Sequence, residues 1–99
     1  MNSDLPVPET VEKEVLPDLH YPAADVLNNP VTRQQRHHDA ERAATLGNAY
    51  HGKVDIYFQT ADGATKRVYT TVWAADQEHL TLKSGGSLPL RAVLRFEFY

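Results

Sequence analysis

Five histidines are the residues of this 99-residue chain with the clearest capacity for metal chemistry. His37 and His38 are adjacent, and neighbouring residues on a helix point about 100° apart, so they cannot share one helix face. A helical metal pair needs ligands three or four residues apart. His37 and Glu41 have that spacing, but an ordinary surface pair has it as well. We therefore expect no metal site and no cofactor.

Serine, threonine and carboxylate side chains show no catalytic spacing. Gly85 and Gly86 precede a predicted strand, whereas a phosphate-binding loop needs a helix N-terminus or a nest behind its glycines. A turn between strands is the better interpretation. Asp76 and Glu78 lie in a polar turn without apolar neighbours that would raise a carboxyl pKa. The sequence predicts no catalytic residue, and we expect that the protein is not an enzyme.

Aromatic and basic residues alternate in the C-terminal half, a pattern typical of binding to single-stranded nucleic acid through stacking and a basic groove. Tyr69 and Trp73 lie four residues apart on one predicted strand, which would place them on the same face about 13–14 Å apart. The alternative is that these aromatic residues pack beneath a helix or the N-terminal arm. The predicted RNA-binding residues are Lys53, Lys66, Arg67, Tyr69, Trp73, Arg91 and Arg95.

One helix and several strands must position these residues. Asn29 and Pro30 are suited to the N-cap and first position of a helix, and Gly47 with Asn48 to its end. From Lys53 onward the apolar period changes from 3.6 to 2. Five strands are predicted at 53–60, 65–75, 79–84, 87–90 and 93–99. Their expected inward residues are Val54, Ile56, Phe58, Val68, Val72, Leu80, Leu82, Leu88, Leu90, Leu94, Phe96 and Phe98.

Short links between these strands force antiparallel neighbours, and one apolar face favours curling into a small closed barrel. Pro89 indicates an edge or broken strand, and the residues after it a one-turn corner. The fold class predicted is mainly β: a five-stranded antiparallel barrel preceded by one α-helix, with an irregular N-terminal arm. The domain boundaries are 1–29 for the arm and 30–99 for the helix and barrel.

The order of helix, "GKVDIYFQTADGATKRVYTTVW", "EHLTLK" and "LPLRAVLRFEF" resembles the SH3-like and Sm-like small barrels. Within that group it is similar to the Rof family of bacterial inhibitors of Rho-dependent termination, over roughly residues 40–98. The resemblance implies a non-enzymatic regulatory module that binds RNA or the Rho protein. The acidic, proline-rich arm and the basic residues of the helix depart from the Rof pattern.

The N-terminal arm is acidic: residues 1–30 hold six carboxylates and one lysine, whereas residues 31–99 carry a net charge of +2. Five of the six prolines lie in the same stretch, so we expect an irregular, mobile or loosely docked arm. An acidic arm can compete with nucleic acid for a basic face. It can also, together with strand edges, serve a protein partner or a homo-oligomer.

The chain has no cysteine, which suits a reducing compartment. Its first residues lack the pattern of a signal peptide, and no apolar run approaches the roughly 20 residues that span a bilayer. We therefore expect a cytoplasmic protein without a membrane partner. The two candidate functions are binding of single-stranded RNA and interaction with a protein, including self-association.

Overall fold

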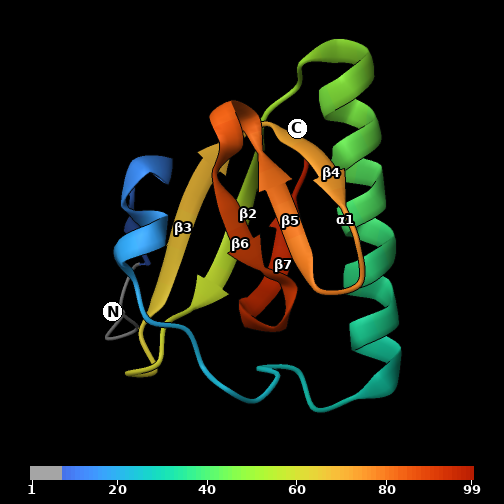
Figure 1. Cartoon of the computed structure of the whole chain (residues 1–99). Coiled ribbons are helices and arrows are strands. Elements are labelled where there is room, and N and C mark those ends of the chain that lie inside the picture. The colour runs from blue at the N-terminus through green and yellow to red at the C-terminus, as the bar shows by residue number, and fades with distance from the viewer. Residues whose placement is uncertain (1–7) are drawn as a thin grey trace, which may run out of the picture.

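The structure is a computed structural model and describes residues 8–99. Two β-sheets face each other, and one long helix stands along the side of the molecule (Figure 1). The first sheet has the order β1 (Glu9–Thr10), β3 (Thr65–Thr70), β2 (Val54–Gln59), β7 (Val93–Glu97). The second has the order β4 (Val72–Ala75), β5 (His79–Leu82), β6 (Ser87–Pro89). The helix is α1 (Pro30–Tyr50), and the 3-10 turns are η1 (Lys13–Asp18), η2 (Lys83–Gly85) and η3 (Leu90–Ala92).

The predicted closed barrel of five strands is wrong, because residues 8–99 form seven strands in two separate sheets. The strand predicted over residues 65–75 is in fact two strands. The chain leaves the first sheet and enters the second at Thr71, the single residue between β3 and β4. The chain returns to the first sheet through η3, at the position of the predicted corner. β6, which contains Pro89, is an edge strand as expected. The mainly β architecture with one preceding helix is confirmed.

The helix begins where the sequence predicted and ends later. The Asn29 side chain accepts a hydrogen bond from the Val31 amide at 2.7 Å, and Pro30 is the first helical residue. Gly47 does not stop the helix, which continues to Tyr50 and is capped by His51 in the left-handed conformation. Gly47 is instead buried against β4: a Cβ atom there would lie 2.0 Å from the Val72 carbonyl oxygen. Glycine is required at this position for close packing.

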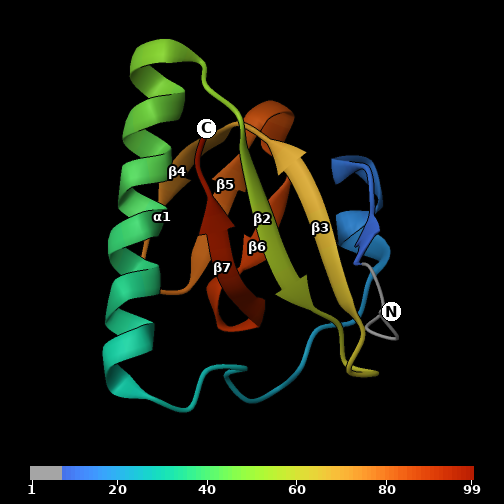
Figure 2. The same cartoon turned by 180° about the vertical axis from the view of Figure 1, so that it is seen from behind.

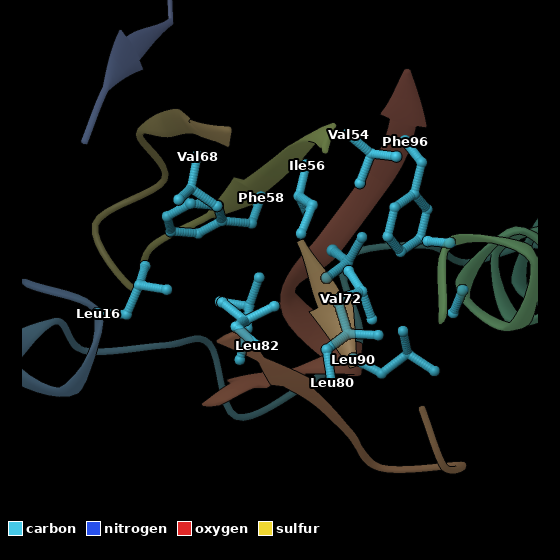
Figure 3. Packing of buried hydrophobic residues seen from close by; sticks show 14 residues of the cluster. Leu16, Val54, Ile56, Phe58, Val68, Val72, Leu80, Leu82, Leu90 and Phe96 are labelled. Atoms are coloured by element: carbon cyan, nitrogen blue, oxygen red, sulfur yellow. The ribbon is translucent and has the colours of Figure 1, made fainter. Parts of the chain in front are cut away.

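The core lies between the two sheets and is lined by residues of both (Figure 3). Most of the predicted inward residues are buried, but Leu94 and Phe98 are only partly so. The β2–β7 register shifts between Tyr57 and Phe58, so that Phe58 pairs with Val93. Val93 is fully buried in place of Leu94. A bulge adds one residue to a strand and reverses the faces beyond it, which simple alternation does not predict.

Residues 8–29 of the N-terminal arm are docked, which corrects the expectation of a mobile or loosely attached segment for this part, whereas residues 1–7 lie outside the described residues. Figures 1 and 2 show it running from the side of β3 across one end of the molecule to the start of α1. Leu16 is fully buried beside Phe58 and Val68 (Figure 3). The Tyr21 hydroxyl donates to the Leu16 carbonyl oxygen at 2.7 Å, and burial raises the pKa of Tyr21 to about 12. The arm therefore forms part of the core.

A buried ion pair fixes the other end of the arm to the helix. Arg36 is only 6% exposed, and its two terminal nitrogens donate to the Asp25 carboxylate at 2.8 and 2.7 Å. One of them also donates to the Val93 carbonyl oxygen at 3.0 Å. The hydrogen bond from Arg36 holds the pKa of Asp25 below its usual value of 3.8. The guanidinium group of Arg36 in α1 thus contacts both the N-terminal arm and β7.

None of the helices formed by residues 8–99 is long and apolar enough to cross a membrane.

Leu16→Ala tests whether the arm belongs to the core. Removing a fully buried leucine should lower the free energy of unfolding by about 2–5 kcal/mol. Val15→Ala is the control, because Val15 is 39% exposed and its loss should change stability by less than about 0.5 kcal/mol. Urea unfolding followed by the fluorescence of Trp73 measures both. Equal effects would contradict the docked arm.

Asp25→Asn tests the ion pair through its pH dependence. The folded-state pKa of Asp25 is depressed, so its stabilising contribution is fully present above pH 3.8 and is lost as the pH falls through the folded value. We expect the variant to be less stable than the wild type at pH 7. The difference should shrink as the pH falls below 3.8. A difference that stays constant from pH 7 to pH 2, in urea unfolding curves, would show that charge is not the cause.

Candidate binding surface on the outer face of the four-stranded sheet

Six side chains form a two-by-three grid on the outer face of the first sheet, the side turned away from the core and toward the viewer in Figure 2. Asp55 of β2 pairs in register with Tyr69 of β3 and Glu97 of β7. Tyr57 of β2 pairs in the same way with one arginine on each side. We call this set the outer-face grid: Asp55, Tyr57, Arg67, Tyr69, Arg95 and Glu97.

The β7 side of the grid is closed by its own contacts. The Arg95 guanidinium lies 3.9 Å from the centre of the Tyr57 ring and donates to the Glu97 carboxylate at 2.8 Å. The Tyr57 hydroxyl donates to the same carboxylate at 3.2 Å. The hydrogen bond between Arg95 and Glu97 raises the pKa of the arginine and lowers that of the acid. These contacts leave Tyr57 only 8% exposed although it lies on the outer face of the sheet.

The β3 side of the grid is more open. Tyr69 is 52% exposed, and Tyr99 lies edge-on to it with ring centres 6.0 Å apart. The Tyr99 hydroxyl donates to the buried Asp55 carboxylate, which also lies 3.7 Å from Arg67 Nε. These residues and Thr10 line a concavity of about 390 Å³. Lys53 lies at its margin, with its ammonium group 5.5 Å from the centre of the Tyr69 ring.

The structure brings together three of the seven predicted RNA-binding residues: Lys53, Arg67 and Tyr69. Arg95 lies on the same face but is stacked on Tyr57. In this neighbourhood Arg67 is the most constrained cation, because Thr10 Oγ1 accepts from its Nε and Nη2 atoms at 3.1 and 2.8 Å. Hydrogen bonding with Tyr57 raises the pKa of Arg67 above its usual value.

Trp73 does not share a face with Tyr69, because the two residues lie on different strands. The chain crosses to the second sheet at Thr71, and Trp73 lies on β4 at a register shift between β4 and β5. Its carbonyl oxygen accepts from the Asn48 side chain of α1 at 2.7 Å. The indole is 44% exposed, so it is not packed beneath the helix. The predicted platform of Tyr69 and Trp73 on one strand is therefore wrong.

Lys66 and Arg91 lie away from the outer-face grid. Lys66 alternates with Arg67 along β3, so it points to the opposite side of the sheet, where it pairs with the Glu9 carboxylate. Arg91 lies on η3, and its Nε donates to the Pro22 carbonyl oxygen at 2.7 Å. Both cations hold the N-terminal arm. They contribute to the fold rather than to the surface around Tyr69.

Tyr99 is the member of this surface that the sequence did not reveal. It follows the last strand, and nothing in its spacing indicates that it turns back to Asp55 on β2. The chain's C-terminal end lies beside the start of β2, which makes this contact geometrically simple (Figure 2). The strand predicted over 93–99 included Tyr99, whereas β7 ends at Glu97, so the sequence held no signal for this contact.

Within residues 8–99, no three histidine, cysteine or carboxylate side chains gather in a metal-binding arrangement. His37 and Glu41 form the i, i+4 surface pair, at 3.6 Å. The chain matches no protein-family model, no curated protein and no solved structure. The resemblance to the Rof family thus remains an expectation from the sequence pattern.

Tyr99→Phe tests the contact that closes the surface over Asp55. Loss of the hydroxyl leaves a buried carboxylate with one donor fewer, so unfolding free energy should fall by about 1–2 kcal/mol. Tyr50→Phe is the matched control, because Tyr50 is 77% exposed at the end of α1 and should change stability by less than about 0.5 kcal/mol. Both are measured by urea unfolding. Similar small effects in the two variants would mean that Tyr99 does not bind Asp55 in solution.

Proposed function

We propose that the chain is a non-enzymatic regulatory module that binds single-stranded RNA on the outer face of its four-stranded sheet. One observation carries the proposal: two exposed tyrosines, Tyr69 and Tyr99, flank a concavity with cations at its side and margin. Bases stack on aromatic side chains irrespective of their sequence, and this stacking contributes about 1–3 kcal/mol per base. Tyr69 is the first stacking platform in this proposal.

Lys53 and Arg67 are suited to contact phosphate. The Lys53 side chain is exposed and adjoins the Tyr69 ring, so a phosphate next to a base stacked there would lie within its reach. Arg67 lies two residues before Tyr69 on β3 and lines the same concavity. Two phosphate contacts on a single strand predict a slope of about −1.4 for log K against log salt concentration.

The contacts of the two outer-face carboxylates favour a role in recognition. Glu97 is hydrogen-bonded by Arg95, which keeps its pKa low, and Asp55 accepts from Tyr99 beside Arg67. A general acid or base works best with a pKa near the operating pH, so the lowered pKa of Glu97 does not suit proton transfer. Both carboxylates orient arginine and tyrosine side chains of the surface. This arrangement supports a binding role for the grid.

Tyr69→Ala should weaken binding of a fluorescein-labelled oligo-uridine by roughly 5- to 150-fold, the equivalent of one lost stacking interaction. Tyr69→Phe should retain most of the affinity because its ring still stacks. Fluorescence anisotropy at fixed low salt measures the dissociation constants, and circular dichroism checks the fold. Equal losses for Ala and Phe would show that stacking is not the interaction.

Trp73→Ala is the second control, because it removes an exposed aromatic ring from the other sheet. We expect its affinity for oligo-uridine to stay within about twofold of the wild type. Lys53→Ala should reduce the salt slope by about 0.7, the contribution of one phosphate contact. RNA binding that depends on Trp73 but not on Tyr69 would place the site on the second sheet and overturn the proposal.

A further inference from the structure

The outer edge of β3 is only partly covered. On one side β3 pairs with β2 over all six of its residues. On the other it pairs in parallel with β1 at two positions, Lys66 with Glu9 and Arg67 with Thr10. Both residues of β1 are exposed. The last rung is a hydrogen bond from the Val11 amide to the Arg67 carbonyl oxygen at 2.8 Å, after which the chain turns into η1.

Beyond that rung the edge continues at Tyr69. Backbone groups of a strand alternate in direction, so the amide and carbonyl of Tyr69 point the same way as the carbonyl of Arg67. Among residues 8–99, no backbone hydrogen bond from the arm reaches Tyr69. The edge therefore offers unpaired main-chain groups of the kind that accept an added strand.

Side chains along this edge select for acidic and hydroxyl groups. The arm itself is the example: Lys66 binds the Glu9 carboxylate on one side of the sheet. Arg67 binds the Thr10 hydroxyl on the other. Successive residues of an extended strand point to opposite faces, so one acidic and one hydroxyl residue in sequence satisfy both cations. Beyond Arg67, Tyr69 and the neighbouring Lys53 add an aromatic ring and a further cation to the same surface.

The tip of the arm, which we define as residues 9 and 10, is exposed and is held less firmly than Val11, which packs against the core. Its ion pair joins the Lys66 side chain, which is 18% exposed, to that of Glu9, which is 67% exposed, and pairs open to solvent contribute about 0–1 kcal/mol. The body of the arm is fixed separately by the buried Leu16 and by Asp25 bound to Arg36. Release of the tip from β3 would therefore leave these two contacts of the body intact.

We propose that the outer edge of β3 is a docking site for an extended acidic segment of a partner protein, which replaces the tip of the arm. The segment adds to the sheet as a strand, a common mode of peptide recognition in which main-chain hydrogen bonds give affinity and alternate side chains give specificity. The preferred partner segment has an acidic residue that pairs with Lys66, followed directly by a serine or threonine whose hydroxyl accepts from Arg67. The proposal goes beyond RNA binding and does not depend on it.

A labelled peptide with the sequence of residues 8–12, Pro-Glu-Thr-Val-Glu, serves as the probe for the full chain. In the wild type the tip competes with it. Glu9→Lys places a lysine opposite Lys66 and should release the tip, so the peptide should bind this variant at least about tenfold more tightly, because the open state is more populated. Thr10→Val removes the hydroxyl bound by Arg67 and should give a smaller increase. Fluorescence anisotropy measures affinity.

Glu14→Lys is the matched control, since it makes the same change of charge at an exposed position of the arm outside the tip. Its peptide affinity should equal that of the wild type. Adding Lys66→Glu to the Glu9→Lys chain should abolish binding, because the rebuilt tip competes and the new carboxylate repels the peptide. In ¹⁵N spectra the peptide should shift the amides of residues 66–69.

Two outcomes would overturn the proposal. Equal peptide binding by the Glu9→Lys and Glu14→Lys chains would show that overall charge, not the tip, governs the interaction. An unchanged peptide affinity together with at least tenfold tighter oligo-uridine binding by the Glu9→Lys chain would assign the freed cations to nucleic acid. Circular dichroism and thermal unfolding of each variant confirm that the fold is retained.

Discussion

The burial of one charged group, the Arg36 guanidinium, governs how the parts of this molecule are assembled. A buried charge needs partners, and removing one partner is far more destabilising than losing a surface contact. Here the partners come from separate segments: the Asp25 carboxylate from the arm and the Val93 carbonyl oxygen from β7. Arg36 of α1 can be buried without a large loss of stability only when the arm and β7 are both in place. That requirement explains why a polar, proline-rich segment is ordered over residues 8–29.

Local sequence signals predicted the parts of the fold that local physics determines. The cap at Asn29 and the first helical residue Pro30 depend only on neighbouring residues. The edge position of Pro89 followed from its missing amide. What failed depends on distant contacts. Gly47 looks like a helix end until Val72 is known to lie against it, and the bulge at Leu94 arises from pairing with β2.

The candidate surface was predicted in part for the same reason. Alternation along β3 correctly places Arg67 and Tyr69 on one face, and the same rule applied strictly sends Lys66 to the other. It could not place Trp73, because the rule fails once the chain changes sheet at Thr71. Tyr99 was missed because its partner Asp55 lies 44 residues earlier. Burial of the arm depends on Leu16, which packs against Phe58 of β2 and Val68 of β3. The sequence around Leu16 is polar and does not indicate these distant contacts.

The parallel pairing of β1 with β3 has a consequence for the order in which the molecule is made. Glu9 and Lys66 are separated by 57 residues, so the first strand to leave the ribosome has no partner until the β2–β3 hairpin has been synthesised. At about 5–20 residues per second, that interval is about 3–11 seconds. During this time the arm must stay soluble and unpaired. Its carboxylates and prolines, which looked like features of a disordered tail, are also what a strand needs to remain free while it waits.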